Sequence, residues 1–447
     1  MRRDVNWIGL IADPGSEQPL LGDDESVAAA WIRVEGRRVM FVWSRFEVAA
    51  GTLSIAAGKR LVDAFDAAAR DETPVFALAN SGGARMQEGT RAFMQMVGAA
   101  RAARRVRSAG VPLIVYLADP TTGGVFASWG SLATITWAEP GATIGFTGPR
   151  VAAALGEPIE PASSQTAEGL FANGLVDAVV APELIRSELA NALAALDRDE
   201  AWDAGSGSVV AESSVGGESA RVNYPDEVTD GPSGWAAVQA SRSGGRLDVL
   251  AQLLKRADHH LEVRGDRGGA VDDAVLCAIA RVDGRPLMVI GHRDPGARPR
   301  AAGLRTALRA MALAEELRLP VVAVIDTAGA MIGGEQEREG FAGEIAKSLD
   351  TMSRLTVPTV ALVAGQGTGG AAMAWLAADE IIAAPDAWIA PIAPEAASLI
   401  VRRDADHAAE MADLQRVGAI ELRGQGIVSR VVAAEDLIDA ALASVSR

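Results

Sequence analysis

The 447-residue sequence contains a single cysteine, Cys277. One cysteine excludes internal disulfide bonds and any zinc ribbon built on four cysteines. The chain also lacks an uninterrupted apolar run of about 18 residues, the length that a membrane-spanning helix requires. No apolar core of the signal-peptide type follows the charged residues at its N-terminus. These absences together predict a cytoplasmic protein that has no membrane partner.

Lysine is also scarce, since Lys59, Lys255 and Lys347 are the only three. None of them lies in a GxxxxGK[ST] phosphate-binding loop. None follows a methionine either, as the attachment lysine of a biotin carrier does. The formal net charge is -16, whereas nucleic-acid binding usually shows as an excess of basic residues. We therefore expect no nucleic-acid partner and no biotin attached to this chain.

The four histidines are His259, His260, His292 and His407. Their spacing matches no metal-binding motif such as HExxH, so no metal site is predicted. We expect His259 and His260 to be exposed at the end of a helix. For His292 a structural role is favoured over a catalytic one.

The chain repeats itself at a long offset. Residues 74–83 match 320–329, residues 111–115 match 357–361, and residues 122–124 match 368–370, each pair 246 positions apart. Matches in one order with a constant offset predict an internal duplication. Two copies are too few for a solenoid, so they predict two similar globular domains.

Each half has the same pattern of elements. A helix (58–70 or 304–319) precedes a short apolar strand, then a glycine-rich turn, a second helix (91–109 or 340–355) and a second strand. Alternating strands and helices predict an α/β fold. We expect an N-terminal domain over 1–198 and a C-terminal domain over 233–447, with a helical lead-in around residues 235–257. Between the domains, residues 199–232 are rich in acidic residues, serine and glycine, as is typical of a solvated linker.

Two Thr-Gly-Gly turns are the main candidates for chemistry. Gly123 and Gly124 follow a strand in the first half, and Gly369 and Gly370 follow the equivalent strand in the second. A helix that starts after a strand leaves backbone N–H groups unpaired, and glycine lets a ligand approach them closely. Such groups can hold an anionic oxygen. The alternative reading is that these glycines only let a helix pack tightly on a sheet.

The preceding strand of each half also ends in a glycine-rich turn. The sequence there is Ser81-Gly82-Gly83-Ala84-Arg85 in the first half and Asp326-Thr327-Ala328-Gly329-Ala330 in the second. A thioester enolate needs about two converging N–H donors, as in oxyanion holes. One donor from each of two neighbouring turns would provide them.

At this point the sequence resembles a known family. Residues 74–180 resemble the β half of bacterial acetyl-CoA carboxylase carboxyltransferase, and residues 235–430 resemble its α half. The matching stretches are 81–89, 119–128 and 138–150 in the first half, and 264–267, 283–286 with 291–292, 325–330, 365–371 and 392–397 in the second. Fused in this order, the halves are similar to single-chain carboxyltransferases of actinobacterial type.

The resemblance implies a fold, a reaction and partners. Each half is expected to have a crotonase-like (ClpP/crotonase) fold. The expected reaction moves a carboxyl group from carboxybiotin to acetyl-CoA or another short acyl-CoA, giving malonyl-CoA or methylmalonyl-CoA, as in fatty acid biosynthesis. The biotin would be carried by a biotin carboxylase or biotin carboxyl carrier subunit of an ATP-dependent complex. Biotin is expected to act as its own base.

The resemblance also assigns roles to residues. Gly123 and Gly124 are expected to hold the thioester enolate, and Gly369 and Gly370 the ureido oxygen of biotin. The further substrate-binding candidates are Gly82, Gly83 and Arg85 for the acyl-CoA, and Gly329, Ala330 and Ala371. The site is expected to form between the first half of one subunit and the second half of another. A homodimer or larger homo-oligomer follows, and one folded subunit alone would be inactive.

The sequence departs from the family at two points. It cannot form the four-cysteine zinc ribbon that often begins the β subunit. Ala328 stands where the family commonly has proline, which would loosen that turn. Two other functions remain open: a decarboxylase of malonyl thioesters, and a carboxyltransferase-like scaffold without catalysis.

Two patterns suggest weaker alternatives. Residues 365–370 match GxGxxG, although the acidic residue that a dinucleotide site requires is misplaced. Arginine clusters at 101–107 and 402–403 are typical of solvated helix faces, and contact with CoA phosphates is the alternative.

Overall fold

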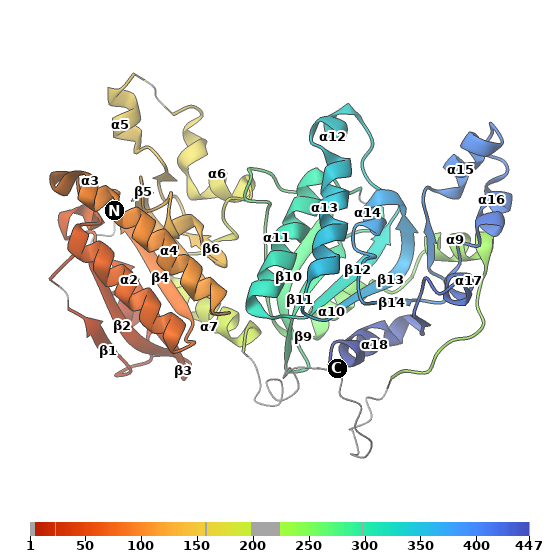
Figure 1. Cartoon of the computed structure of the whole chain (residues 1–447), viewed down its shortest axis with the longest axis horizontal. Coiled ribbons are helices and arrows are strands. Elements are labelled where there is room, and N and C mark those ends of the chain that lie inside the picture. The colour runs from red at the N-terminus through yellow and green to blue at the C-terminus, as the bar shows by residue number, and fades with distance from the viewer. Residues whose placement is uncertain (1–4, 23, 157–158, 198–223, 297, 447) are drawn as a thin grey trace, which may run out of the picture. The chain divides into compact units, whose positions relative to one another are not determined.

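The computed structural model describes residues 5–22, 24–156, 159–197, 224–296 and 298–446 (Figure 1). The chain divides into two compact units. The first comprises residues 1–194 together with 264–271, and the second comprises 195–263 and 272–447. Residues 198–223, which include most of the predicted linker, lie outside the described residues. None of the described helices has the length and apolar character of a membrane span.

The first unit is built on an eight-stranded sheet. Its order is β1-β2-β3-β4-β5-β6-β8, and β7 pairs with β5. The neighbours from β1 to β3 are antiparallel, and those from β3 to β8 are parallel. The strands are β1 (Gln18–Leu21), β2 (Val27–Val34), β3 (Arg37–Ser44), β4 (Val75–Ser81), β5 (Leu113–Thr122), β6 (Ile135–Ala138), β7 (Ile144–Gly145) and β8 (Ala178–Val179).

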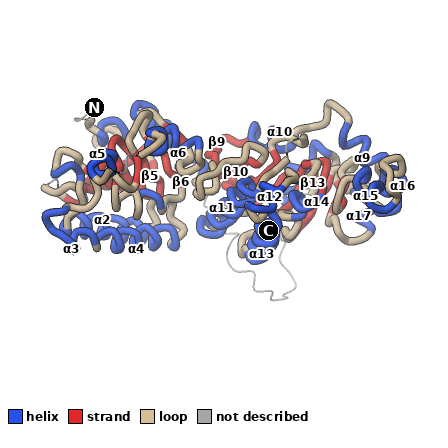
Figure 2. The backbone as a smooth tube through the Cα atoms, turned by 90° about the horizontal axis from the view of Figure 1, so that it is seen from above, coloured by secondary structure: helices blue, strands red, loops and turns tan. Residues whose placement is uncertain are grey.

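Helices cover this sheet and close its core. The helices are α1 (Trp7–Ile11), α2 (Ile55–Arg70), α3 (Gly89–Phe93), α4 (Gln95–Ser108), α5 (Pro149–Ala154), α6 (Ala167–Ala172) and α7 (Ile185–Ala195). Ser54 caps α2 by accepting a hydrogen bond from the backbone N–H of Ala57 at 2.9 Å. The buried face of α2, with Leu61 and Phe65, packs into the core cluster against the β4 and β5 residues Val75 and Val115. Figure 2 shows α2 and α4 side by side along one face of the sheet.

The second unit repeats this plan. Its sheet has the order β9-β10-β11-β12-β13-β14-β16, with β15 paired to β13. The strands are β9 (Ala257–Glu262), β10 (Val275–Val282), β11 (Arg285–His292), β12 (Val321–Thr327), β13 (Thr359–Thr368), β14 (Glu380–Ala383), β15 (Trp388–Ala390) and β16 (Arg430–Val431). The helices are α9 (Gly234–Arg242), α10 (Val249–Arg256), α11 (Ala301–Leu317), α12 (Gly334–Arg338), α13 (Phe341–Arg354), α14 (Gly369–Met373), α15 (Pro394–Val401), α16 (Ala408–Gln415), α17 (Ala419–Gly424) and α18 (Leu437–Ser444).

The two sheets correspond strand for strand. Each begins with two antiparallel pairings and continues in parallel, and each has a short strand paired to the end of its fifth strand. The central strands are buried on both faces, which explains why they appear in the sequence as continuous apolar runs. The predicted α/β fold with an internal duplication is therefore confirmed.

The structure changes three details of the predicted elements. The helix expected over 91–109 is divided at Met94, between α3 and α4. The helical lead-in over 235–257 is divided into α9 and α10 by residues 243–248. His259 and His260 lie on the strand β9, not at a helix end, because this segment pairs antiparallel with β10.

Candidate active site

The first Thr-Gly-Gly turn lies at the carboxyl end of β5. Gly123 has φ +69°, a left-handed conformation that favours glycine. The segment after it is a series of turns and not the predicted helix, although the Ala127 N–H donates to the Gly123 carbonyl at 3.1 Å. The Ser128 hydroxyl donates to the Gly124 carbonyl at 2.6 Å within these turns.

The two glycine-rich turns of the first unit touch each other. A β-carbon at Gly83 would lie 3.5 Å from the Gly123 Cα and 3.6 Å from the Gly124 nitrogen. A β-carbon at Gly123 would lie 3.3 Å from the Gly83 Cα. Gly83 also has a positive φ, +105°. The positive φ favours glycine at both positions, and at Gly123 a β-carbon would also make a contact tighter than usual with the other turn.

Most N–H groups in these turns already have acceptors. Gly82 donates to the Ala50 carbonyl, Gly83 to the Ser81 hydroxyl and Gly123 to the Gly145 carbonyl, each at 3.0 Å. Within the described parts of the chain, the N–H groups of Ala84 and Gly124 have no acceptor. Ala84 and Gly124, one on each turn, are thus among the described residues whose backbone N–H groups have no acceptor within the protein.

Arg85, which follows this turn, makes contacts within the protein. Its guanidinium donates to Glu25 Oε1 at 2.7 Å and to the Thr52 carbonyl at 3.1 Å. Burial raises the pKa of Glu25, but hydrogen bonds, chiefly from Arg85, outweigh it and lower that pKa to about 2. Arg85 therefore ties the turn to the start of β2 and to the loop before α2.

The second unit has the same arrangement after β12. Gly329 has φ +112°, and its N–H donates to the Thr327 hydroxyl at 3.1 Å, as Gly83 does to Ser81. The Ala328 N–H donates to the Pro295 carbonyl at 3.2 Å. A proline at 328 has no N–H to make this bond, so in this chain the turn is anchored by the residue that departs from the family pattern.

The second Thr-Gly-Gly turn opens α14, as the sequence predicts. Gly369 has φ +64°. Gly370 and Ala371 lie in the first turn of the helix, where N–H groups have no partner inside the helix. A β-carbon at Gly370 would lie 2.4 Å from Ile345 Cδ1, so glycine is also needed there for packing. The Ala330 N–H has no acceptor among the described residues.

Donors without acceptors thus occur at equivalent places in the two units. Ala84 corresponds to Ala330 and Gly124 to Gly370, at the offset of the duplication. Sequence reasoning selected Ala330 but missed Ala84. The constant offset was the signal that could have found it.

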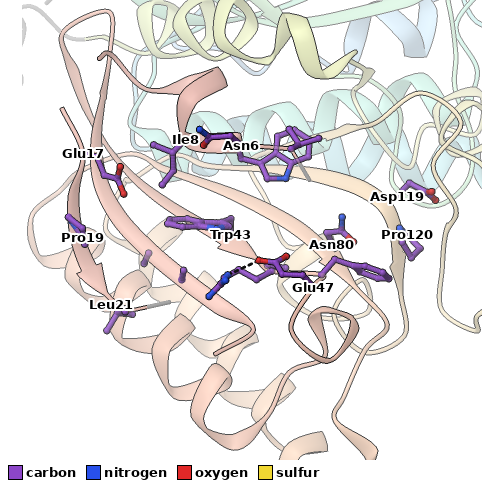
Figure 3. Close-up of a pocket in the computed structure, with 18 residues that line it drawn as sticks. Asn6, Ile8, Glu17, Pro19, Leu21, Trp43, Glu47, Asn80, Asp119 and Pro120 are labelled. Atoms are coloured by element: carbon purple, nitrogen blue, oxygen red, sulfur yellow. Dashed lines mark hydrogen bonds and ion pairs between the residues drawn. The ribbon is translucent and has the colours of Figure 1, made fainter. Parts of the chain in front are cut away.

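A cavity of about 440 Å³ lies at the ends of β3, β4 and β5 (Figure 3). Trp43, Asn80 and Pro120 line it, with Ile8 from α1. Alternation along β4 places Asn80 on the face of the sheet opposite α2, because Val75, Ala77 and Ala79 belong to the helix-covered core. This cavity could not be predicted from the sequence, since it depends on how the strand ends meet.

The second unit has a cavity of about 460 Å³ at the corresponding place. Asp326, the equivalent of Asn80, lines it together with His292, Arg246 and Gln366. Each cavity borders the strand ends that lead into the candidate turns. None of the glycines of those turns lines either cavity.

His292 is buried in the second unit, with its side chain against Trp375 at 4.4 Å between ring centres. Its Nδ1 accepts the Asp326 N–H at 3.4 Å. Burial lowers the pKa of His292 to about 3. The ring is therefore neutral at physiological pH and packs beside the strand that leads into the second turn.

His292 is expected to remain neutral as the pH falls from 7 to 5. The unfolded chain takes up this proton below its usual pKa of 6.5, so the contribution of His292 to stability is full above that pH. It then falls by about 1.4 kcal/mol per pH unit as the pH drops towards the folded pKa. NMR titration of the histidine ring protons checks this. His407 is the internal reference, because Asp404 raises its pKa; a midpoint near 6.5 for His292 would contradict the expectation.

The glycines of the GxGxxG match serve packing. A β-carbon at Gly365 would lie 1.8 Å from Arg246 Nη1, and one at Gly367 would lie 3.0 Å from the Trp388 carbonyl.

In the first of the two arginine clusters, 101–107, Arg105 forms an ion pair with Asp66 at 2.7 Å. Among the residues that the structure describes, no group of three or more His, Cys, Asp or Glu side chains is placed to hold a metal ion.

Comparisons with known proteins assign each half of the chain to a carboxyltransferase family model. Residues 16–184 match the family model for a carboxyl transferase domain, and residues 218–441 match the model for acetyl co-enzyme A carboxylase carboxyltransferase-like proteins. The chain therefore belongs to the carboxyltransferase family of biotin-dependent acyl-CoA carboxylases, and it is a carboxyltransferase enzyme.

Individual relatives cover nearly the whole chain. A "probable biotin-dependent acyl-coenzyme A carboxylase beta3 subunit" of Mycobacterium tuberculosis is 43% identical over 433 residues, which is 94% of this chain and 83% of the relative. The "acetyl-coenzyme A carboxylase carboxyl transferase subunits beta/alpha" protein of Salinispora arenicola is 35% identical over 91% of this chain and 73% of its own length.

Solved structures show the same fold. The transcarboxylase 12S structure with methylmalonyl-coenzyme A bound superposes with a TM-score of 0.78 at 22% identity, over 98% of this chain and 88% of that one. A single-chain, multi-domain long-chain acyl-CoA carboxylase gives a TM-score of 0.72 at 21% identity, over 98% of this chain and 45% of that one. The predicted crotonase-like fold in both halves is confirmed.

Proposed function

We propose that this chain transfers the carboxyl group of carboxybiotin, held on a partner carrier protein, to acetyl-CoA or another short acyl-CoA. The observation that carries the proposal is that each unit has a pair of neighbouring turns. In each pair, described residues have backbone N–H groups without acceptors in the protein. Two such pairs suit a reaction in which two oxygens gain charge, one on each substrate.

In the first unit, the N–H groups of Ala84 and Gly124 are suited to the acyl-CoA thioester. They would hold its oxygen as the Cα proton leaves and the oxygen becomes an enolate. Gly82, Gly83 and Gly123 would act through the backbone, because their own N–H groups or carbonyls hold the two donors in place. Their lack of side chains also lets the thioester approach the donors.

In the second unit, the N–H groups of Ala330, Gly370 and Ala371 are suited to the ureido oxygen of biotin, and Gly329 and Gly369 would shape the two turns that carry them. When bound, carboxybiotin supplies the carboxyl group, and its ureido nitrogen takes up the proton of the acyl Cα. The donors fit this group because they are neutral, carry no bulky side chain and come from two adjacent turns. A shared site would combine the first unit of one subunit with the second unit of another in a homo-oligomer.

The test is reconstitution. Purified protein, biotin carboxylase, the biotinylated carrier, ATP and bicarbonate are mixed with acetyl-, propionyl- or a long-chain acyl-CoA. We expect a carboxylated thioester from at least one short acyl-CoA, measured as fixed radioactive bicarbonate. Partner subunits that are active with another carboxyltransferase, but give no product with this chain, would refute the proposal. Release of carbon dioxide from malonyl-CoA without biotin would favour a decarboxylase instead.

A further inference from the structure

Arg246 lies in the break between α9 and α10, and its guanidinium joins two strand ends. Its Nη2 donates to Asp326 Oδ2 at 2.5 Å, and its Nη1 donates to the Ala364 carbonyl at 3.1 Å. Asp326 belongs to β12 and Ala364 to β13. The side chains of Arg246 and Asp326 are 15% and 11% exposed, so the ion pair is largely removed from water.

Asp326, which pairs with Arg246, also accepts a hydrogen bond from the backbone of β13. Its Oδ1 accepts the Gln366 N–H at 2.9 Å, and its own N–H donates to His292 Nδ1 at 3.4 Å. Gly365 is small because the guanidinium occupies the space that a β-carbon would take, 1.8 Å from Arg246 Nη1. Asp326 on β12 therefore binds the guanidinium, and Gly365 on β13 leaves the space that it occupies.

These strand ends lead directly into the two turns of the second unit. Gly329 follows Asp326 by three positions, and Gly369 follows Gln366 by three. The link lies where the register of β12 and β13 is irregular, just before the Thr327–Gly367 pairing from which both turns continue. The separation of two donors is the property on which the binding of a single oxygen depends.

Among the described residues of the first unit, no arginine makes such a link. Asn80 stands at the position equivalent to Asp326, and Asp119 stands at the position equivalent to Gly365. The Asp119 carboxylate accepts the Thr143 N–H at 2.9 Å instead. Within the described residues, the arginine link therefore distinguishes the second unit from the first.

We propose that Arg246 is a positioning residue for the second pair of turns, which fixes the spacing of the donors that hold biotin. The ligand named here rests on the proposed function, whereas the positioning itself does not. Arg246 touches no reacting atom and acts through Asp326 and the ends of β12 and β13. Removing it would leave the Asp326 carboxylate buried without its partner, and that charge would displace the strand ends.

Arg246→Ala is tested in the reverse reaction, with a carboxylated acyl-CoA as donor and biocytin (biotin linked to lysine) as acceptor. We expect kcat/KM for biocytin to fall about 100-fold, the effect of misplacing a binding group by roughly 1 Å. The KM for the acyl-CoA should not change, because the first unit holds it. Methylguanidinium added to the variant should restore part of the activity, since the cavity that Arg246 lines is open to solvent. Arg354→Ala, which breaks an exposed ion pair, is the control and should behave as wild type.

Hydrogen exchange gives a readout that does not depend on activity. Peptides covering residues 327–331 and 366–371 should exchange faster in Arg246→Ala than in Arg354→Ala, while peptides of the first unit should not change. Arg246→Lys keeps the charge but can replace only one of the two hydrogen bonds, so it should give an intermediate result even where the alanine variant does not fold. Exchange equal to wild type in a folded Arg246 variant would overturn the positioning role. A wild-type protein that carboxylates no biocytin would overturn the proposed function instead.

Discussion

Replacing Gly123 by alanine is expected to lower kcat for carboxyl transfer by about 100- to 1000-fold, the range seen when one oxyanion donor is lost. The new β-carbon would lie 3.3 Å from the Gly83 Cα. It would push apart two backbone turns that cannot rearrange as a flexible side chain can. If the N–H groups of Ala84 and Gly124 hold one oxygen as we propose, this movement would separate them. Initial rates with saturating acyl-CoA measure the effect.

Gly141→Ala is the matched control for this substitution. Gly141 also has a positive φ, +71°, but a β-carbon there meets nothing within 4 Å. Both variants therefore carry the backbone strain of alanine in a left-handed conformation, about 1 to 2 kcal/mol. Only Gly123→Ala adds the contact between the turns. Equal kcat values in the two variants would show that the spacing of the turns is unimportant to catalysis.

The α/β fold and its duplication could be predicted because they depend on local patterns. Apolar strands, amphipathic helices and the constant offset between 74–83 and 320–329 are all visible in one dimension. The glycines of the turns were also visible. The sequence did not show which N–H groups these turns leave without acceptors. The N–H groups of Gly83 and Gly123 are not free, because they donate to the Ser81 hydroxyl and the Gly145 carbonyl. That depends on hydrogen bonds whose geometry appears only in three dimensions.

Long-range polar contacts account for most of what the sequence did not show. Arg246 is 80 positions from Asp326, and no periodicity connects them. The dipeptide Gly244-Gly245 was the local sign that the helical lead-in breaks just before Arg246. Similarly, residues 264–267 resemble the α half of the family, yet the structure groups 264–271 with the first unit. Contact partners, unlike local structure, are not encoded by the spacing of residue types.

Asp177→Ala is expected to destabilise the first unit by about 3 to 5 kcal/mol, the cost of removing one partner from a buried charge pair. The Asp177 side chain is 1% exposed and forms an ion pair with Arg267. It also accepts the N–H groups of Thr136 at 2.8 Å and Arg264 at 3.0 Å. Alanine would leave these buried donors without their acceptor. Urea unfolding, followed by tryptophan fluorescence, measures the change.

Asp66→Ala provides the comparison, because it breaks the more exposed pair with Arg105, whose side chains are 33% and 48% exposed. That variant should lose no more than about 1 kcal/mol, and an equal loss in both variants would contradict the role given to Asp177.

The contact between Asp177 and Arg267 also shows that the segment 264–271 belongs to the first unit. A β-carbon at Gly265 would lie 2.3 Å from the Gly174 Cα, so this segment packs closely against the residues before Asp177. A fragment ending at residue 232 lacks this segment and should therefore be destabilised as Asp177→Ala is, although it retains every strand of the first sheet.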